Sequence, residues 1–432
     1  MNIKLTAIAD VPDGSEIEPP SYQKQLTAFY QAAILNSLPV VLWRVPYEAD
    51  KQALVDCSGI VAPTKVDFQA QIPGFVFSPF INEQGQSTLF LRADVTLQAD
   101  KGLHVANHDS AQHQAAFLHD FQTLSQTADF GKRDWQLVPR TSASPHLSSK
   151  DEFCTLVEDA VSYIQSTDIK KVVASRATEV PLPAHFNPVD TFDHLCATYA
   201  HAFISLISIP GLGTWIGATP EILLTLDADQ LHTIALAGTQ SPPPDTSPET
   251  ITWGAKEVEE QALVSDYVRQ FFESLSISDY EEVGPETVSA GNIVHLRTDF
   301  RVNTKQAVQG EATSLLHLGN LILDNLHPTS AVCGMPKREA LSFILEREQY
   351  ARQFYSGFLG PVHINQQSQL FVNLRCMQLA SDNAILYVGV GVTKDSVPEL
   401  EWQETVWKSK TLLAVLEKAF AAQNALEPAL SV

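Results

Sequence analysis

Two segments of the chain place several charged side chains on one side of a predicted helix. Near the C-terminus, Glu401, Glu404 and Lys408 stand at positions i, i+3 and i+7, which a helix brings onto one stripe. On an earlier predicted helix, Lys256 and Glu260 stand at i and i+4. If the two helices converge, their carboxylates can hold Mg²⁺, which prefers hard oxygen ligands and keeps waters for a substrate. The alternative is that both stripes are solvated faces with surface ion pairs.

Two further charged residues stand in apolar surroundings where their acid–base behaviour can change. Lys171 lies in a β-branched run that predicts a strand, and a desolvated lysine can serve as a base. Glu221 follows a proline at the start of another predicted strand, where burial would raise its pKa and favour a general acid. The alternatives are an edge-strand lysine whose ammonium reaches water, and an ordinary turn carboxylate.

Several other residues could bind an anionic ligand. Gly238 in Ala-Leu-Ala-Gly-Thr and Gly391 in Gly-Val-Gly-Val could present backbone N–H groups, although neither motif has the spacing of a nucleotide-binding loop. Arg375 stands in an otherwise apolar run, so it is either paired internally or aimed at a carboxylate. His295 is the type of residue that can be either structural or catalytic. For the glycines, simple turns remain the alternative.

The elements that must position these residues alternate between helical and strand periodicity. A capping box of Ser149 and Glu152 predicts the start of a helix that continues through Ile164. Predicted helices cover residues 23–36, 153–164, 255–275, 313–325 and 401–422. Predicted strands cover residues 39–44, 87–92, 170–180, 203–209, 214–218, 221–226, 232–237, 370–379 and 384–392. Several tight turns separate these strands, so we expect an α+β protein with antiparallel sheet.

Composition and charge exclude several classes of function. The chain has 432 residues and a net charge of −22, which disfavours nucleic acid and anionic membranes as partners. Its five cysteines lack any Cys-x-x-Cys spacing, so neither a disulfide framework nor a zinc site is expected, and a cytoplasmic location fits best. The first twenty residues do not have the pattern of a secretory signal, and no segment is apolar enough to span a membrane.

Taken in order, these motifs resemble the chorismate-utilising enzymes, a family that includes isochorismate, salicylate, anthranilate and aminodeoxychorismate synthases. The resemblance covers roughly residues 150–420 and is loose before that. The matching runs are KVVASR (171–176), IGATPEILL (216–224), ALAGT (235–239), KEVEEQALV (256–264), VHLRT (294–298), HPTSAVCGMP (327–336), LFVNLRC (370–376), GVGV (389–392) and EWQETVWK (401–408).

The resemblance implies a catalytic pair and a metal site. Lys171 would be the base that activates water for attack at C2 of chorismate, and Glu221 the acid that assists loss of the C4 hydroxyl. Glu260 and Glu404 would hold Mg²⁺, with Glu401 nearby. Because chorismate is a dianion, the metal would bridge its ring carboxylate to an otherwise repulsive acidic site.

The resemblance also implies how the substrate is bound. The Gly238 N–H, with Thr239 beside it, and Lys408 would hold the ring carboxylate. The remaining binding residues would be Tyr355, Arg375 and the Gly391 N–H on the enolpyruvyl carboxylate, and His295 beside the ring.

Three features separate the branches of the family. Lys171 is the lysine expected of the water-using members, and Ala237 replaces the nucleophilic lysine of aminodeoxychorismate synthases. The 327–336 loop resembles the isochorismate form. Gln240 and Gln261 depart from the usual arginine and histidine, which puts only local geometry in doubt.

We therefore predict an isochorismate synthase with no glutaminase subunit. A salicylate synthase, which also eliminates pyruvate, is the alternative within the family. A non-catalytic chorismate-binding module is the alternative from another class. The sequence does not decide between a menaquinone and a siderophore pathway.

The resemblance implies one large unit of two antiparallel sheets flanked by helices. Residues 1–145 would form the N-terminal part of that unit, and residues 146–432 its chorismate-binding catalytic region.

Overall fold

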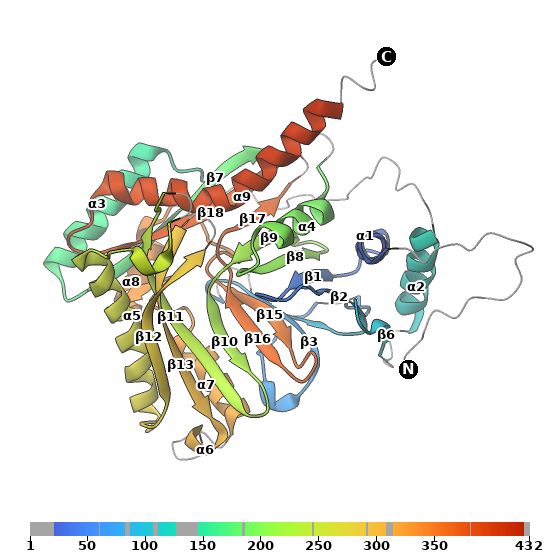
Figure 1. The fold of residues 1–432 in the computed structure, drawn as a ribbon, viewed down its shortest axis with the longest axis horizontal. Helices are drawn as coiled ribbons and strands as arrows, with labels where there is room; N and C mark the ends of the chain where they lie inside the picture. The colour runs from blue at the N-terminus through green and yellow to red at the C-terminus, as the bar shows by residue number, and fades with distance from the viewer. Residues whose placement is uncertain are drawn as a thin grey trace, which may run out of the picture.

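The fold is given by a computed structural model (Figure 1). It describes residues 21–59, 61–82, 87–106, 111–126, 146–183, 186–243, 246–290, 293–307, 314–380 and 382–426. No described helix is long and apolar enough to cross a membrane.

Two antiparallel sheets form the framework within the described residues, which confirms the predicted α+β class with two such sheets. The 10-stranded sheet has the order β14 (Gly334–Met335), β7 (Lys171–Pro181), β18 (Asn383–Val392), β17 (Cys376–Leu379), β9 (Gly213–Thr219), β8 (Phe203–Ile209), β1 (Val40–Arg44), β2 (Lys51–Val55), β5 (Val95–Gln98) and β6 (Gly102–Val105). The 8-stranded sheet has the order β12 (Glu281–Ala290), β13 (Ile293–Asn303), β11 (Gln230–Gln240), β10 (Ile222–Leu226), β16 (Ser368–Val372), β15 (Phe358–Val362), β3 (Gly74–Ser78) and β4 (Leu89–Arg92).

Helices cover the outer faces of the two sheets (Figure 1). They are α1 (Tyr22–Leu35), α2 (Ala111–Gln126), α3 (Lys150–Ser166), α4 (Pro188–Thr198), α5 (Ala255–Ser274), α6 (Thr304–Ala307), α7 (Leu315–Leu326), α8 (Lys337–Arg347) and α9 (Pro398–Leu426), with short 3₁₀ turns at Phe68–Ala70 and Pro248–Thr250. The predicted capping box of Ser149 and Glu152 begins α3, so that expectation is confirmed. Its two reciprocal hydrogen bonds satisfy N–H groups that the first helical turn leaves without partners.

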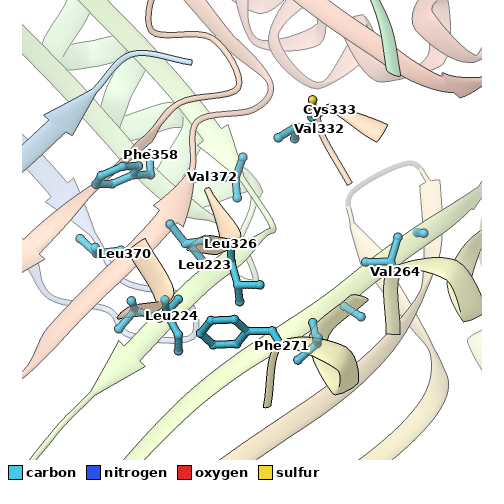
Figure 2. Close-up of a cluster of buried hydrophobic side chains, with 14 of the residues drawn as sticks. Leu223, Leu224, Val264, Phe271, Leu326, Val332, Cys333, Phe358, Leu370 and Val372 are labelled. Atoms are coloured by element: carbon cyan, nitrogen blue, oxygen red, sulfur yellow. The ribbon is translucent and has the colours of Figure 1, made fainter. Parts of the chain in front are cut away.

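The apolar interior is layered between these elements. Between the two sheets lies an aromatic layer, in which Phe77 stacks on Phe354 at 3.9 Å and Phe203 on Phe371 at 4.1 Å between ring centroids. A second cluster packs α1, α2, α4 and α9 against the 10-stranded sheet. A third packs α5 and α7 against the 8-stranded sheet, where Phe271 lies beside Leu224 (Figure 2). Burying these side chains is the main favourable term in folding.

One predicted strand is wrong. The run 370–379 forms two strands, β16 and β17, which belong to different sheets. The chain crosses between the sheets at Asn373–Arg375, where Arg375 has a φ of 47°, outside the extended region. Alternation of apolar residues continues across this crossover, so the sequence pattern gives no sign of the break. The crossover places Arg375 between the two sheets.

Strands from the N-terminal part join both sheets. β1, β2, β5 and β6 extend the 10-stranded sheet, and β3 and β4 extend the 8-stranded one. The proposed division near residue 145 stays a prediction, and residues 127–145 around it lie outside the described part of the chain.

Candidate active site

A pocket of about 660 Å³ opens between the two sheets. Its lining comes from β7 and β18 of one sheet, from β11 and β13 of the other, from α5 and α9, and from the crossover at Arg375. The pocket brings together all the predicted catalytic and substrate-binding residues and one predicted metal ligand, namely Lys171, Glu221, Gly238, Thr239, His295, Tyr355, Arg375, Gly391, Lys408 and Glu260. Glu404 and Glu401 do not line it, but they precede Lys408 on α9 by one and two turns.

Lys171 is the first residue of β7, and its alternation with Val173 turns both side chains into the pocket. The lysine is only 1% exposed, which rules out an ammonium that reaches bulk water. Its Nζ atom lies 2.8 Å from Oε1 of Glu260 on α5. The structure therefore places a buried ammonium–carboxylate pair at one wall of the pocket.

Glu221 also lines the pocket, immediately before β10, and its backbone is held by a hydrogen bond from the Val372 N–H to its carbonyl oxygen at 3.0 Å. Burial raises the pKa of its carboxyl group to about 7, although Lys171, Lys408 and Arg375 pull in the opposite direction. A carboxyl group with this pKa is partly protonated at neutral pH and can donate a proton.

The helices α5 and α9 converge at the metal site predicted from the sequence. Lys256 of α5 contacts Glu401 of α9, and the negative charges of the Glu404 and Glu260 carboxylates also act on its ammonium group. Lys408 lies 2.8 Å from Glu404 and donates to the Gly389 carbonyl oxygen at 3.0 Å. Because Glu401 is 1% exposed and the Glu404 and Lys408 side chains are less than a fifth exposed, the α9 stripe is not a solvated face.

The donor chemistry of this site fits Mg²⁺, because it offers carboxylate oxygens from two helices, those of Glu260 and Glu404, which both act electrostatically on Lys256. Within the described ranges, no group of three or more His, Cys, Asp or Glu side chains is placed to hold a metal ion. Mg²⁺ commonly takes one or two carboxylates and completes its shell with substrate and water oxygens. Each of the three carboxylates contacts an ammonium group, Glu260 that of Lys171, Glu404 that of Lys408 and Glu401 that of Lys256. Glu260 and Glu404 would thus hold such an ion only together with other oxygens and in place of these ammonium contacts.

A chain of hydrogen bonds fixes the imidazole of His295. Its Nδ1 lies 2.8 Å from the Gly238 carbonyl oxygen, and Nη2 of Arg375 lies 2.6 Å from its Nε2. The carbonyl can only accept and the guanidinium can only donate, so the imidazole carries its proton on Nδ1. Burial, followed by the charge of Arg375, lowers the pKa of His295 well below its usual value. His295 therefore lines the pocket as a neutral side chain.

Two glycines of β18 make room for the functional side chains. A Cβ atom at Gly391 would lie 2.3 Å from Oε1 of Glu260 and 2.8 Å from Cε of Lys171. A Cβ atom at Gly389 would lie 2.7 Å from the hydroxyl of Tyr355. The glycines thus belong to a strand rather than to a turn. Gly391 permits the close approach of α5 to β7 and β18, and Gly389 permits that of the Tyr355 hydroxyl.

The sequence reasoning missed several residues that line the pocket. Val173 and Tyr387 face it from β7 and β18, and Ala331 and Val332 face it from the loop before β14. The Tyr387 ring stacks on Tyr355 with centroids 5.7 Å apart. Val173 could have been found from its alternation with Lys171, whereas Tyr387 carries no local signal.

Comparison with known proteins now assigns the family. Residues 72–417 match the family model described as chorismate binding enzyme. This chain belongs to that family of chorismate-utilising enzymes.

Relatives from two branches of the family align with the chain. It is 25% identical over 302 residues to a vibriobactin-specific isochorismate synthase of Vibrio cholerae, covering 64% of this chain and 74% of the relative. It is 26% identical over 325 residues to an anthranilate synthase component 1 of Haloarcula marismortui, covering 71% of this chain and 61% of the relative. Its fold is similar to that of MenF, the menaquinone-specific isochorismate synthase of Escherichia coli, with a TM-score of 0.70, 21% identity and coverage of 90% and 91%.

Proposed function

We propose that the protein isomerises chorismate to isochorismate with Mg²⁺ as its cofactor. The observation that carries the proposal is that buried Lys171 and Glu221 line one pocket, with burial raising the pKa of Glu221 to about 7. The Vibrio cholerae relative, named an isochorismate synthase, supports the same choice.

In this proposal the two residues move one proton each. Lys171, in its neutral amine form, would take a proton from the water that attacks C2, and Glu221 would give its proton to the hydroxyl that leaves C4. Water is added at one carbon and lost from another, so the reaction is balanced without a redox partner. Positioned acids and bases of this kind typically contribute about 10²–10⁴-fold each.

The other pocket residues would bind and orient a dianionic substrate. Lys408 and the Gly238 N–H, with Thr239 beside it, would hold the ring carboxylate, and Arg375 with Tyr355 and the Gly391 N–H the enolpyruvyl carboxylate. A Mg²⁺ ion held by Glu260 and Glu404 would supply positive charge opposite the ring carboxylate. Neutral His295 would line the ring without adding charge.

The experiment is to incubate the purified protein with chorismate, in Mg²⁺ or in EDTA, and to resolve the products by chromatography. Isochorismate that forms with Mg²⁺ and not with EDTA is the expected result. Salicylate with pyruvate would instead identify a salicylate synthase, and anthranilate formed from ammonia would identify the anthranilate branch. A protein that binds chorismate without turning it over would be a binding module.

The setting of the reaction forms part of the same proposal. The five cysteines are free thiols, which suits a reducing cytoplasm. We propose that no glutaminase subunit is needed, because water rather than ammonia is the nucleophile, and that neither nucleic acid nor a membrane is a partner.

A further inference from the structure

A buried ion pair lies behind the pocket, outside its lining. Glu348 and Arg352 follow α8, and their side chains are 3% and 2% exposed. The carboxylate accepts from Nη2 of Arg352 at 2.6 Å and from Nε at 2.8 Å. The guanidinium also lies over the ring of Phe80, 4.4 Å from its centroid. A fork-to-fork pair packed on an aromatic ring has one fixed orientation.

The remaining donors of Arg352 reach two walls of the pocket. Nη1 donates to the carbonyl oxygen of Val332 at 2.8 Å, and Nη2 donates to that of Val173 at 2.7 Å. Both acceptor residues line the pocket, one from the loop before β14 and the other from β7, two residues after Lys171. The Val173 N–H in turn donates to the Cys333 carbonyl oxygen at 2.9 Å. The guanidinium of Arg352 therefore links β7 to the loop before β14 at the point where the two are hydrogen-bonded to each other.

The carboxylate of the pair holds β7 at a second point. Oε1 of Glu348 accepts from the backbone N–H and from the hydroxyl of Ser175, both at 2.8 Å. The Ser175 hydroxyl also lies 2.6 Å from that of Tyr350. Ser175 and Lys171 are four residues apart in one strand, so they share a face. The pair thus holds β7 at two points, Val173 and Ser175, two and four residues after Lys171.

The loop held by Arg352 belongs to the buried core as well as to the pocket. Val332 and Cys333 lie together at the margin of the apolar cluster that includes Val264 and Leu326 (Figure 2). Because close-packed interiors transmit displacements, a shift of this loop would reach the pocket wall.

We propose that Arg352, oriented by Glu348, is a positioning residue that sets the place of Lys171 by fixing β7 against the 329–333 loop. The inference rests on the proposed function, since it takes Lys171 as the base. Arg352 acts through the carbonyl groups of Val173 and Val332 and does not touch the substrate. Displacing a reacting group by about 1 Å can cost about 10²-fold in rate.

The test compares Arg352→Lys with Arg347→Lys. A lysine keeps the charge opposite Glu348 but cannot reach Val173 and Val332 at the same time. The control changes an arginine five residues earlier whose Nη1 lies 3.1 Å from Asp159, with both side chains about half exposed. With chorismate and Mg²⁺, we expect kcat of the Arg352 variant, per folded protein, to fall by about tenfold to a hundredfold while KM stays within about threefold. The control should retain wild-type values.

Hydrogen exchange gives a second measurement that does not depend on turnover. We expect faster exchange in peptides containing the Val173 amide in Arg352→Lys, and unchanged exchange there in Arg347→Lys. Guanidinium ion added to Arg352→Ala should restore part of kcat, because it can refill the site between the two carbonyl groups.

Two results would overturn the inference. One is a kcat loss no larger than the loss of folded protein measured by circular dichroism. The other is unchanged exchange at Val173. A wild-type protein that makes no isochorismate would instead defeat the proposed function, while the exchange measurement would still report whether Arg352 holds the strand and loop together.

Discussion

Glu260 and Glu221 line one pocket, with 13% of the Glu260 side chain and 6% of Glu221 exposed, but the pKa values of their carboxyl groups move in opposite directions. Burial would raise the pKa of Glu260, yet the ammonium groups of Lys171 and Lys408 outweigh it and the pKa is lowered. For Glu221 burial dominates and the pKa rises to about 7. The difference lies in contact, because Lys171 is 2.8 Å from Glu260. Within one pocket, a direct partner decides whether burial favours the charged or the neutral form.

The two carboxyl groups therefore suit different tasks. Glu260 keeps a negative charge and suits the binding of cations, whereas Glu221 keeps a proton near neutral pH and suits proton donation.

The largest expected effect comes from removing the Lys171 side chain, whose contact with Glu260 distinguishes the two carboxyl groups. Lys171→Ala should lower kcat/KM for chorismate by about 10²–10⁴-fold, because the proposed base is lost. Lys170→Ala is the matched control, since its side chain is exposed at the preceding position. Folding is checked by circular dichroism, and near-normal turnover by folded Lys171→Ala would refute the proposed base.

Glu260→Gln should be the most destabilising change of a pocket carboxylate. It leaves the ammonium of Lys171 buried without its partner, which typically costs about 3–5 kcal/mol in the free energy of unfolding. Urea denaturation measures the loss, and Glu259→Gln on the same helix, at an exposed position, should change little. Equal stabilities of the two variants would mean that the contact with Lys171 contributes nothing.

Above neutral pH, Glu221→Gln should change the free energy of unfolding in the opposite direction to Glu260→Gln. The pKa of Glu221 is about 7 in the folded protein, against an ordinary value of 4.5 in the unfolded chain, so its contribution to stability is complete below about 4.5 and is lost as pH rises through 7. Each pH unit in that window costs about 1.4 kcal/mol, or roughly 3 kcal/mol in all. The variant lacks this loss, so its stability relative to wild type should rise between pH 5 and pH 8. A constant difference across that range would exclude the raised pKa.

The smallest expected effect is in the pH dependence of the wild-type reaction. Because Glu221 must be protonated to act as the acid, its ionisation should make log kcat/KM fall as pH rises above about 7, with a limiting slope near −1. Initial rates of isochorismate formation across this pH range measure the fall in kcat/KM. Activity that keeps rising well above neutral pH would assign the proton donor elsewhere.

Local patterns predicted the features that depend on neighbours in sequence. The spacing of Ser149 and Glu152 located the start of α3, and alternation in β7 carries the signal that puts Val173 on the same face as Lys171. The α9 stripe was also predicted, because helical spacing alone puts Glu404 and Lys408 together.

Other features depend on contacts that no local pattern encodes. The crossover at Arg375 was missed because apolar alternation continues through it while the chain changes sheets. β12 was missed because it is mostly exposed and polar, and it pairs with β13 through partners such as Glu286 and Arg297. The short distance between Lys171 and Glu260 depends on the close approach of α5 that Gly391 permits.

The most direct test of the proposed reaction is to run it in ¹⁸O-labelled water and to analyse the product by mass spectrometry. If water attacks C2 and the original C4 hydroxyl leaves, isochorismate should carry one ¹⁸O atom, located at C2. Unlabelled isochorismate would contradict the proposed roles of Lys171 and Glu221, because the hydroxyl would then have moved within the substrate without water as the nucleophile.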